Sequence, residues 1–364
     1  MSSLLFFDAV CQRPYSLRSL EESALGGTEA SVVRIAEALD AEVMQHNRVA
    51  AEGRYRPPGD SSGVEHLVVL RDPRVLRTAA SRFPGARVYL WLHDLVRPGS
   101  KRGRRLAAAA ATLAQLDVTL VCVSDFQRRQ AEAVLAHARI ADRVRAVRIY
   151  NPIDDALTPN GTATDPDRLV FFSSPNKGLA LTLDAFQALR RSMPQLCLRV
   201  GSPGYKSLER AGLERVEGRI AGVEWLGALP HARILEEVRS ALCVFYPNFV
   251  LPETFGLALA EARAVGTPVL THDCGAAAEV LADPAQVLPV TRAVRMYERS
   301  AALLPRRLRA RYAACADRAG VFAPYVERIR DWRSGARPAT GPDARFRTST
   351  VGAQWRTLLG GKIA

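Results

Sequence analysis

Short apolar runs alternate along this chain with longer stretches whose apolar residues recur at helical spacing. In the first half, β-branched and aromatic runs predict strands at residues 4–10, 41–45, 67–70, 87–92, 118–123 and 144–149. Amphipathic stretches between them predict helices near 27–39, 104–116 and 125–136. Strands that alternate with helices are typical of parallel sheets covered on both faces.

The second half repeats this rhythm after a segment that is dense in turn-forming residues. Strands are predicted at 168–172, 196–200, 223–226, 242–246, 268–271 and 286–288, and helices near 179–192, 231–240 and 257–265. We therefore predict an α/β protein with two Rossmann-like, doubly wound domains that face each other across a ligand-binding cleft. The predicted parts are an N-terminal domain (1–155), a hinge (156–167), a C-terminal domain (168–325) and a tail (326–364) that packs back on the N-terminal domain.

The most informative stretch runs from Leu251 to Leu281. A predicted strand leads into a loop with Glu253, and a helix then begins near Gly256 and carries Glu261 eight positions after Glu253. Glycine lets a ligand approach the backbone closely, and the N–H groups of Phe255, Gly256 and Leu257 at the helix start favour an anion such as a diphosphate. A carboxylate at Glu261 can accept hydrogen bonds from two vicinal hydroxyls. The alternative is an ordinary helix whose acids are solvated.

The frame E-T-F-G-L-x3-E-A-x-A-x-G-x-P-V in this stretch resembles the donor-site signature of retaining glycosyltransferases of family four, the glycosyl transferases group 1, which have the GT-B fold. The resemblance extends over residues 3–330 and implies that Glu253 contacts the donor sugar and Glu261 holds the nucleotide ribose. It further implies donor contacts from Thr254, Phe255, Gly256 and Leu257.

A second motif, Phe172-Ser-Ser-Pro-Asn-Lys177-Gly178, lies between a predicted strand and a helix. Lys177-Gly178 resembles the Lys-Gly pair with which this family binds the donor diphosphate. Many relatives carry an arginine five residues before the lysine, where this chain has Phe172, so we expect Ser173, Ser174 or Asn176 to donate hydrogen bonds instead. A surface lysine in an ordinary loop is the alternative.

Three features of the N-terminal half complete the candidate site. Gly26-Gly27 resembles the family's glycine loop, which cradles phosphate or admits the acceptor, although a simple helix entry explains it equally well. His93 ends an apolar strand and resembles the family's cleft histidine, which contacts the donor sugar; a local hydrogen bond is the alternative. His46 follows the second strand, where an acceptor contact and a structural role are both open.

Charge adds a question about partners. The chain carries a formal net charge of +13, from 50 Lys and Arg against 37 Asp and Glu, and only four of the basic residues are lysines. Eleven basic and four acidic residues lie in 97–150, and 13 basic and four acidic residues lie in 301–364. The Lys101–Arg105 run favours docking on an anionic membrane surface, or merely reflects an arginine-rich composition. Aromatic residues do not interleave with the arginines, so we expect no nucleic-acid partner.

Other classes are excluded by what the sequence lacks. No run approaches 18 apolar residues, and residues 4–10 contain Asp8 without a basic leader, so a strand is predicted rather than a signal peptide. Six scattered cysteines predict reduced core residues and no zinc site. We identify no Asp-x-Asp motif placed to hold a divalent metal between phosphates, so we predict metal-independent transfer with no cofactor beyond the nucleotide-diphosphate sugar.

The resulting expectation is a cytoplasmic glycosyltransferase, associated with the inner face of the plasma membrane if the basic run binds lipid. It would move a sugar, with retention at the anomeric carbon, to a glycan or lipid-linked acceptor in bacterial surface polysaccharide or glycolipid synthesis. His93, Glu253 and Lys177 are the predicted catalytic residues. A nucleotide-sugar epimerase of the same fold and a non-catalytic nucleotide-sugar-binding protein remain alternatives. Donor sugar, base, acceptor and oligomeric state stay open, because specificity resides in loops such as 201–205 and 227–231.

Overall fold

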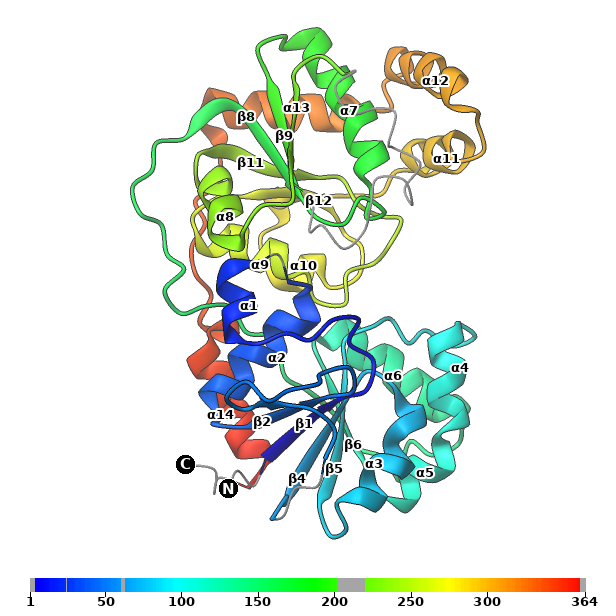
Figure 1. Cartoon of the computed structure of the whole chain (residues 1–364). Helices are drawn as coiled ribbons and strands as arrows, with labels where there is room; N and C mark the ends of the chain where they lie inside the picture. The colour runs from blue at the N-terminus through cyan, green and yellow to red at the C-terminus, as the bar shows by residue number, and fades with distance from the viewer. Residues whose placement is uncertain (1–3, 24, 60–62, 202–219, 361–364) are drawn as a thin grey trace. The chain divides into compact units, whose positions relative to one another are not determined.

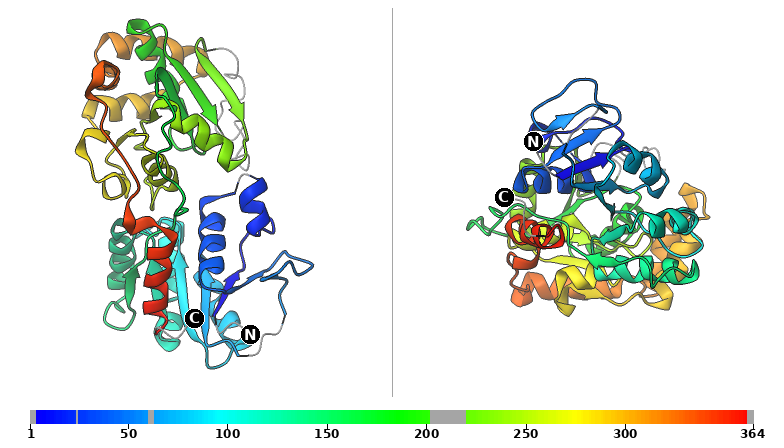
Figure 2. Two further views of the ribbon diagram at one scale, coloured as in Figure 1. Left: turned by 90° about the vertical axis from the view of Figure 1, so that its left-hand side faces the viewer. Right: turned by 90° about the horizontal axis from the view of Figure 1, so that it is seen from below.

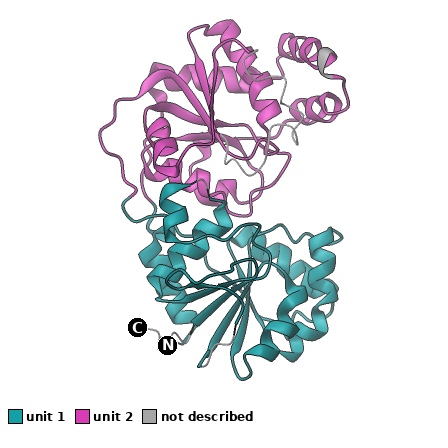
Figure 3. Cartoon of the chain, viewed as in Figure 1, with its two compact units in different colours: residues 1–156, 343–364 teal, residues 157–342 magenta. Residues whose placement is uncertain are grey.

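The chain folds into two compact units. The computed structural model describes all residues except 1–3, 24, 60–62, 202–219 and 361–364, so most of the predicted specificity loop 201–205 lies outside the described residues. Unit 1 comprises Met1–Ala156 and Asp343–Ala364, and unit 2 comprises Leu157–Pro342 (Figure 3).

Unit 1 is built on a sheet whose described strands number seven and are all parallel (Figure 1). Their order is β3-β2-β1-β4-β5-β6-β7, so the direction of winding reverses between β1 and β4. The strands are β1 (Leu4–Asp8), β2 (Glu42–Gln45), β3 (Tyr55–Arg56), β4 (His66–Leu70), β5 (Arg87–Leu92), β6 (Thr119–Cys122) and β7 (Ala146–Arg148). The helices are α1 (Leu17–Glu22), α2 (Gly27–Ala38), α3 (Leu76–Arg82), α4 (Lys101–Ala108), α5 (Ala110–Gln115), α6 (Asp125–His137) and α14 (Thr348–Leu358).

The central strands β1, β4, β5 and β6 consist mainly of buried apolar residues, because helices cover both faces of the sheet. Successive side chains of a strand point to opposite faces. Leu5 and Phe7 of β1 pack in one core layer with residues of α3 to α6, among them Leu106 of α4. Phe6 points the other way, where its ring lies 5.8 Å from that of Trp91 and 5.9 Å from that of Trp355.

The last described segment of the chain completes unit 1. Ile153 donates its backbone N–H to Phe346 over 2.7 Å and accepts from Thr348 over 3.0 Å. Helix α14 then lies beside α2 (Figures 1 and 2), and Arg356 donates to the Ala38 carbonyl over 2.6 Å. The Trp355 ring is fully buried 5.0 Å from Trp91, so α14 supplies part of the unit 1 core.

Unit 2 contains a parallel sheet with six described strands in the order β10-β9-β8-β11-β12-β13. Its winding reverses between β8 and β11. The strands are β8 (Asp165–Phe172), β9 (Cys197–Gly201), β10 (Val223–Gly227), β11 (Ala241–Tyr246), β12 (Val269–His272) and β13 (Val287–Leu288). The helices are α7 (Leu179–Ser192), α8 (His231–Arg239), α9 (Leu257–Ala264), α10 (Ala277–Leu281), α11 (Arg292–Ala301), α12 (Arg306–Arg318) and α13 (Ala323–Asp331).

The buried carboxylate of Asp184 connects helices α7, α11 and α12 of unit 2. Asp184 of α7 accepts hydrogen bonds from the Tyr297 hydroxyl of α11 over 2.8 Å and from Arg309 of α12 over 2.9 Å. Burial raises the pKa of Asp184, while Arg309 and Tyr297 oppose that shift. The cluster holds three helices together and contains none of the predicted site residues.

Several predicted boundaries differ from the structure. The predicted hinge 156–167 belongs almost wholly to unit 2, where β8 already begins at Asp165, and the predicted tail is divided, with 326–342 in unit 2 and 343–364 in unit 1. The predicted helix 104–116 is two helices, α4 and α5, which meet at Ala109. The prediction that the cysteines are core residues is wrong for Cys315, which is exposed, and holds only in part for half-buried Cys197 and Cys274.

Candidate functional site

The two strands at the winding reversal of unit 2 each lead into a loop that carries a predicted site residue. Lys177 follows β8, and Glu253 follows β11. β8 and β11 pair in parallel, so their carboxyl ends meet at one edge of the sheet. Ligands of doubly wound sheets bind at this reversal point. The fold therefore brings together two residues that are 76 positions apart.

Lys177 and Glu253 form a two-pronged ion pair. The Lys177 Nζ donates to Oε1 of Glu253 over 2.9 Å and to Oε2 over 2.8 Å. Glu253 is buried, with 5% of its surface exposed, whereas 28% of the Lys177 side chain is accessible. One face of the ammonium is thus held by the carboxylate, and the remainder is open to a second anionic group.

Tyr246, the last residue of β11, is a member of this cluster that the sequence did not identify. Its hydroxyl donates to Oε1 of Glu253 over 2.6 Å. Burial, together with the Glu253 carboxylate, raises the pKa of Tyr246 well above its ordinary value, so the phenol stays protonated. The neighbouring Asn248 donates to the Tyr246 oxygen over 3.3 Å and to the Leu251 carbonyl over 2.8 Å, which shapes the loop before Glu253.

The backbone of Glu253 is fixed by Gly275. The two residues form a parallel bridge, in which Ala276 donates its N–H to the Glu253 carbonyl over 2.9 Å. Gly275 has φ +79°, and a Cβ there would lie 2.2 Å from the Glu253 carbonyl oxygen and 2.5 Å from its nitrogen. Only glycine satisfies both the positive φ and this approach.

Helix α9 begins at Leu257, close to the start near Gly256 that the sequence predicts. Gly256 is its N-cap residue with φ +96°, preceded by half-buried Thr254 and by buried Phe255, and Leu257 is the first helical residue. Glu261 is 5% exposed inside α9, and its Oε2 lies 3.0 Å from Nε2 of His231 at the start of α8. The interpretation of Glu261 as a solvated surface acid is thus excluded. The sequence placed His231 only within a specificity loop.

The serine and asparagine before Lys177 differ in exposure. Ser174 is buried, and its carbonyl accepts from the Lys177 N–H over 2.8 Å, so it shapes the turn that presents the lysine. Asn176 is exposed. The donor contacts of both side chains stay predictions.

In unit 1, His93 directly follows β5 at the carboxyl edge of the sheet. It is 7% exposed, and its ring lies 4.5 Å from that of Trp91. Burial, reinforced by the charge of Arg71, lowers the pKa of His93 to about 3. The imidazole is therefore neutral at physiological pH and acts as a hydrogen-bonding or apolar group rather than as a cation.

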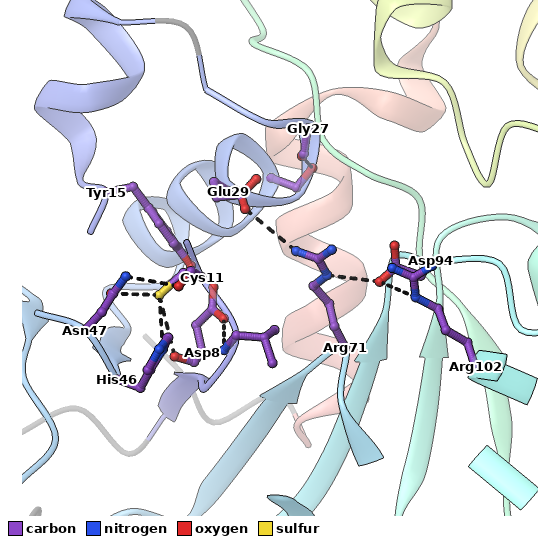
Figure 4. Close-up of polar contacts among 12 residues, drawn as sticks. Asp8, Cys11, Tyr15, Gly27, Glu29, His46, Asn47, Arg71, Asp94 and Arg102 are labelled. Atoms are coloured by element: carbon purple, nitrogen blue, oxygen red, sulfur yellow. Dashed lines mark hydrogen bonds and ion pairs between the residues drawn. The ribbon is translucent and has the colours of Figure 1, made fainter. Parts of the chain in front are cut away.

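A chain of ion pairs joins Glu29, Arg71, Asp94 and Arg102 (Figure 4). Arg71, which follows β4, donates to Asp94 over 3.1 Å and lies 3.7 Å from Glu29. Asp94 also contacts Arg102 of α4 over 3.2 Å. Burial raises the pKa of Glu29, an effect that Arg71 opposes.

The predicted glycine loop belongs to this cluster. Gly26 is the N-cap residue of α2, Gly27 is its first residue, and Glu29 lies in the first turn. A Cβ at Gly26 would lie 2.3 Å from Oε2 of Glu29, so the glycine leaves room for that carboxylate. The loop thereby connects to Arg71 and Asp94, which sequence reasoning did not select.

His46 takes part in a cluster with Cys11 and Asn47, and its predicted acceptor contact stays a prediction. It is exposed, and its Nδ1 lies 3.7 Å from the Cys11 Sγ, which also contacts Asn47 over 3.1 Å. Burial and the charge of Asp8 raise the pKa of Cys11 to about 12. The thiol is protonated at neutral pH, so the Cys-His-Asn grouping holds no thiolate nucleophile.

Neither a metal site nor a membrane span is found in the part of the chain that the structure describes. In the described ranges, no three His, Cys, Asp or Glu side chains group together in a way that would hold a metal ion. An Asp-x-Asp sequence does occur at 165–167, but it lies at the amino end of β8, where Asp165 pairs with Arg168 and Asp167 with Arg333. None of the described helices is both long and apolar enough to cross a bilayer.

A family model of known proteins matches a segment of unit 2. Residues 163–304 match the family model described as glycosyl transferases group 1. The matched segment includes Lys177, Glu253 and Glu261, so the cluster described above lies within the matched residues.

Sequence relatives match only part of the chain. A phosphatidyl-myo-inositol mannosyltransferase of Mycobacterium tuberculosis is 31% identical over 173 residues, which cover 45% of this chain and 42% of that protein. The corresponding protein of Mycobacterium leprae is 30% identical over 112 residues, 31% of this chain and 29% of that protein. The chain thus spans less than half the length of these curated relatives.

Solved structures match nearly the whole chain. HepE of Anabaena, crystallised in complex with UDP-glucose, superposes with a TM-score of 0.63 at 17% identity, over 98% of this chain and 99% of that one. Sucrose-phosphate synthase of Thermosynechococcus elongatus gives 0.61 at 15% identity, over 99% and 100%. The predicted two-domain α/β architecture of the GT-B type is confirmed.

Proposed function

We propose that this protein is a glycosyltransferase that moves a sugar from a nucleotide-diphosphate donor to a glycan or lipid-linked acceptor, with retention at the anomeric carbon. The observation that carries the proposal is the buried Glu253 carboxylate, held by Lys177 and Tyr246 at the winding reversal of unit 2. This cluster joins an anion-binding group to a polyol-binding group in a segment that matches glycosyl transferases group 1.

Each group then has a chemical task. As the bond between sugar and diphosphate breaks, negative charge grows on the diphosphate, and Lys177 with the start of α9 supplies positive potential there. Glu253 orients the sugar, and Glu261 accepts hydrogen bonds from the ribose hydroxyls. His93, neutral by virtue of its low pKa, contacts the sugar without adding a charge beside the developing oxocarbenium ion.

Transfer is proposed to be independent of a divalent metal, because Lys177 provides the cationic contact to the leaving group. Turnover in the presence of a chelator is the direct test. Unchanged turnover supports the proposal, and complete loss that Mn²⁺ restores contradicts it.

A lipid-linked acceptor and a peripheral position at the inner face of the plasma membrane form the second part of the proposal. The basic run that the sequence singled out lies on α4, where Lys101, Arg102 and Arg104 are exposed. The names of the mycobacterial relatives support a lipid acceptor. Co-sedimentation with anionic but not neutral vesicles is expected, and equal binding to both contradicts this part.

Product analysis tests the activity itself. Thermal-shift screening against nucleotide sugars first identifies the donor, since a bound ligand raises the unfolding temperature. A glycosylated acceptor then supports transfer, whereas a free, altered nucleotide sugar identifies an epimerase. Glu261→Ala should weaken donor binding and Glu253→Ala should lower turnover, while Glu236→Ala on the exposed side of α8 serves as the control. Wild-type transfer by both site variants refutes the assignment.

A further inference from the structure

A small pocket lies at the carboxyl edge of the unit 1 sheet. It has a volume of about 160 Å³ and is lined by residues that follow three strands: Val10 after β1, Arg71 after β4 and Asp94 after β5. Helix α4 closes it with Arg102, Arg105 and Leu106. Because β1 and β4 flank the winding reversal of this sheet, the pocket occupies the position where doubly wound sheets bind ligands.

The charged lining of the pocket is predominantly basic. Four arginines line it (Arg71, Arg74, Arg102 and Arg105) against two aspartates, which gives a net charge of +2. The other five lining residues are all apolar. Such a surface attracts an anion and offers it apolar walls that exclude water.

The two aspartates do not neutralise all four arginines of the lining. Asp72 is occupied by Arg74, with a shortest contact of 2.5 Å, and Asp94 is shared between Arg71 and Arg102. The Arg105 side chain is half-buried and makes neither a hydrogen bond nor an ion pair with any residue that the structure describes, although Asp72 attracts it at longer range. Its guanidinium is therefore available to a ligand.

We propose that this pocket binds a phosphate group of the acceptor, an inference that rests on the proposed function and adds the acceptor's chemistry to it. Guanidinium groups match phosphate oxygens in pairs, and the pocket stays net positive even when Glu29, which contacts Arg71 from outside the lining, is counted. The volume is about five times the ~30 Å³ that a water molecule occupies in the liquid, which admits a phosphate group but not a whole nucleotide sugar.

The position also suits an acceptor. Leu92 and Asp94 line the pocket and flank His93 in sequence, the residue proposed to contact the transferred sugar. Glu29, which follows the Gly26-Gly27 loop, contacts Arg71 of the lining (Figure 4). The donor diphosphate has its own cation in Lys177 of unit 2, so a second anion-binding pocket beside His93 fits the other substrate.

Inorganic phosphate is the first probe, used with the Lys177→Ala protein so that the donor site does not contribute. Phosphate replaces chloride at constant ionic strength, and calorimetry or thermal shift gives its affinity. Arg105→Gln should weaken binding tenfold or more, since a charge-assisted contact is lost. Arg104→Gln, the same change on the exposed side of α4, should alter it less than twofold. Equal affinities of these two variants overturn the proposal.

Vesicles distinguish a lipid headgroup from a soluble phosphate. Phosphatidylcholine vesicles with and without phosphatidylglycerol are compared for the same two variants. Both arginines belong to the basic run of α4, so each change should weaken anionic-vesicle binding slightly. A loss at least tenfold larger in Arg105→Gln than in Arg104→Gln supports a lipid phosphate in the pocket. Equal losses in the two variants, combined with Arg105-dependent binding of inorganic phosphate, support a soluble phosphorylated acceptor.

Sugar transfer separates this inference from the proposed function. Once an acceptor is found, Arg105→Gln should raise the acceptor KM tenfold or more and leave the donor KM unchanged. Transfer with an unaltered acceptor KM overturns the pocket assignment and leaves the proposed function intact. Arg105-dependent phosphate binding without sugar transfer to any acceptor supports phosphate binding in the pocket and contradicts the proposed function.

Discussion

The ion pair between Lys177 and Glu253 has a testable consequence for nucleotide binding. Both Glu253 oxygens hold the Lys177 ammonium, so a diphosphate that binds Lys177 must share it with a carboxylate. Glu253→Gln keeps the shape of the side chain and removes its charge. We expect this variant to bind a nucleoside diphosphate more tightly than the wild type, although its sugar-transfer rate falls.

The size of the gain follows from the geometry of the pair. Glu253 Oε2 lies 2.8 Å from the Lys177 Nζ. A phosphate oxygen at hydrogen-bond distance on the other side of Nζ would then lie ~5 Å from the carboxylate. The repulsion between unit charges at that separation is about 0.8 kcal/mol in water and about 3 kcal/mol at an effective dielectric constant of 20. Because Glu253 is buried and Lys177 is partly exposed, we expect an intermediate value, which is about a tenfold gain in affinity.

Isothermal titration calorimetry with UDP, GDP and ADP measures this gain, and a donor assay measures the accompanying loss of turnover. Tyr246→Phe is the matched control, since it removes the 2.6 Å hydrogen bond to Glu253 and leaves both charges in place. This control should show no gain. If Glu253→Gln binds every nucleoside diphosphate more weakly than the wild type, Lys177 is not the diphosphate contact and the reasoning fails.

Three further predictions concern Gly275 in unit 2 and Trp355 and His93 in unit 1. Gly275→Ala should displace Glu253 and abolish nucleoside-diphosphate binding. Gly227 also has positive φ, but no atom lies within 4 Å of the position of an added Cβ, so Gly227→Ala should only lower stability by about 1 kcal/mol. Equal effects of the two changes on binding would contradict the role of the close approach between Gly275 and Glu253. Trp355→Ala should cost about 3–5 kcal/mol in the free energy of unfolding of unit 1, as measured by denaturant titration; a cost below about 1 kcal/mol contradicts the assigned packing of α14. His93 has a lowered pKa of about 3, so its NMR signals should not titrate between pH 5 and 8. The unfolded chain protonates this histidine below its ordinary pKa of 6.5, whereas the folded chain does not. The free energy of unfolding of the wild type should therefore fall relative to that of His93→Asn by about 1.4 kcal/mol per pH unit below pH ~6. A His93 resonance that titrates near pH 6.5 refutes this prediction.

Local patterns in the sequence were sufficient for most of the fold. Strand β5 and helix α7 have the predicted bounds, because an unbroken apolar run and a strong amphipathic repeat define them. Short elements escaped prediction: β3 has two residues and α1 has six, too few for a period to emerge. The division of the predicted tail depends on long-range packing of Trp355, which no local pattern encodes.

The candidate site was predictable where a motif marks it and not where distant residues meet. Glu253, Glu261 and Lys177 stand in recognisable frames, and the structure brings Lys177 and Glu253 into contact. Tyr246 resembled an ordinary core residue of a strand, because the sequence does not reveal where its hydroxyl points. Arg71 is one of 46 arginines, and only the pairing of β1 with β4 places it beside Glu29 and Asp94.

The route of the chain through the two units bears on the order in which they form during synthesis. Unit 2 is one continuous segment, Leu157–Pro342, whereas unit 1 is interrupted by it and needs α14 to cover Trp91. A ribosome releases unit 2 in full before it has made the last helix of unit 1. The nascent N-terminal half must therefore wait, with the part of its sheet around Trp91 uncovered, while nearly 200 residues are translated. That interval is a time at which a chaperone would have an exposed apolar face to bind.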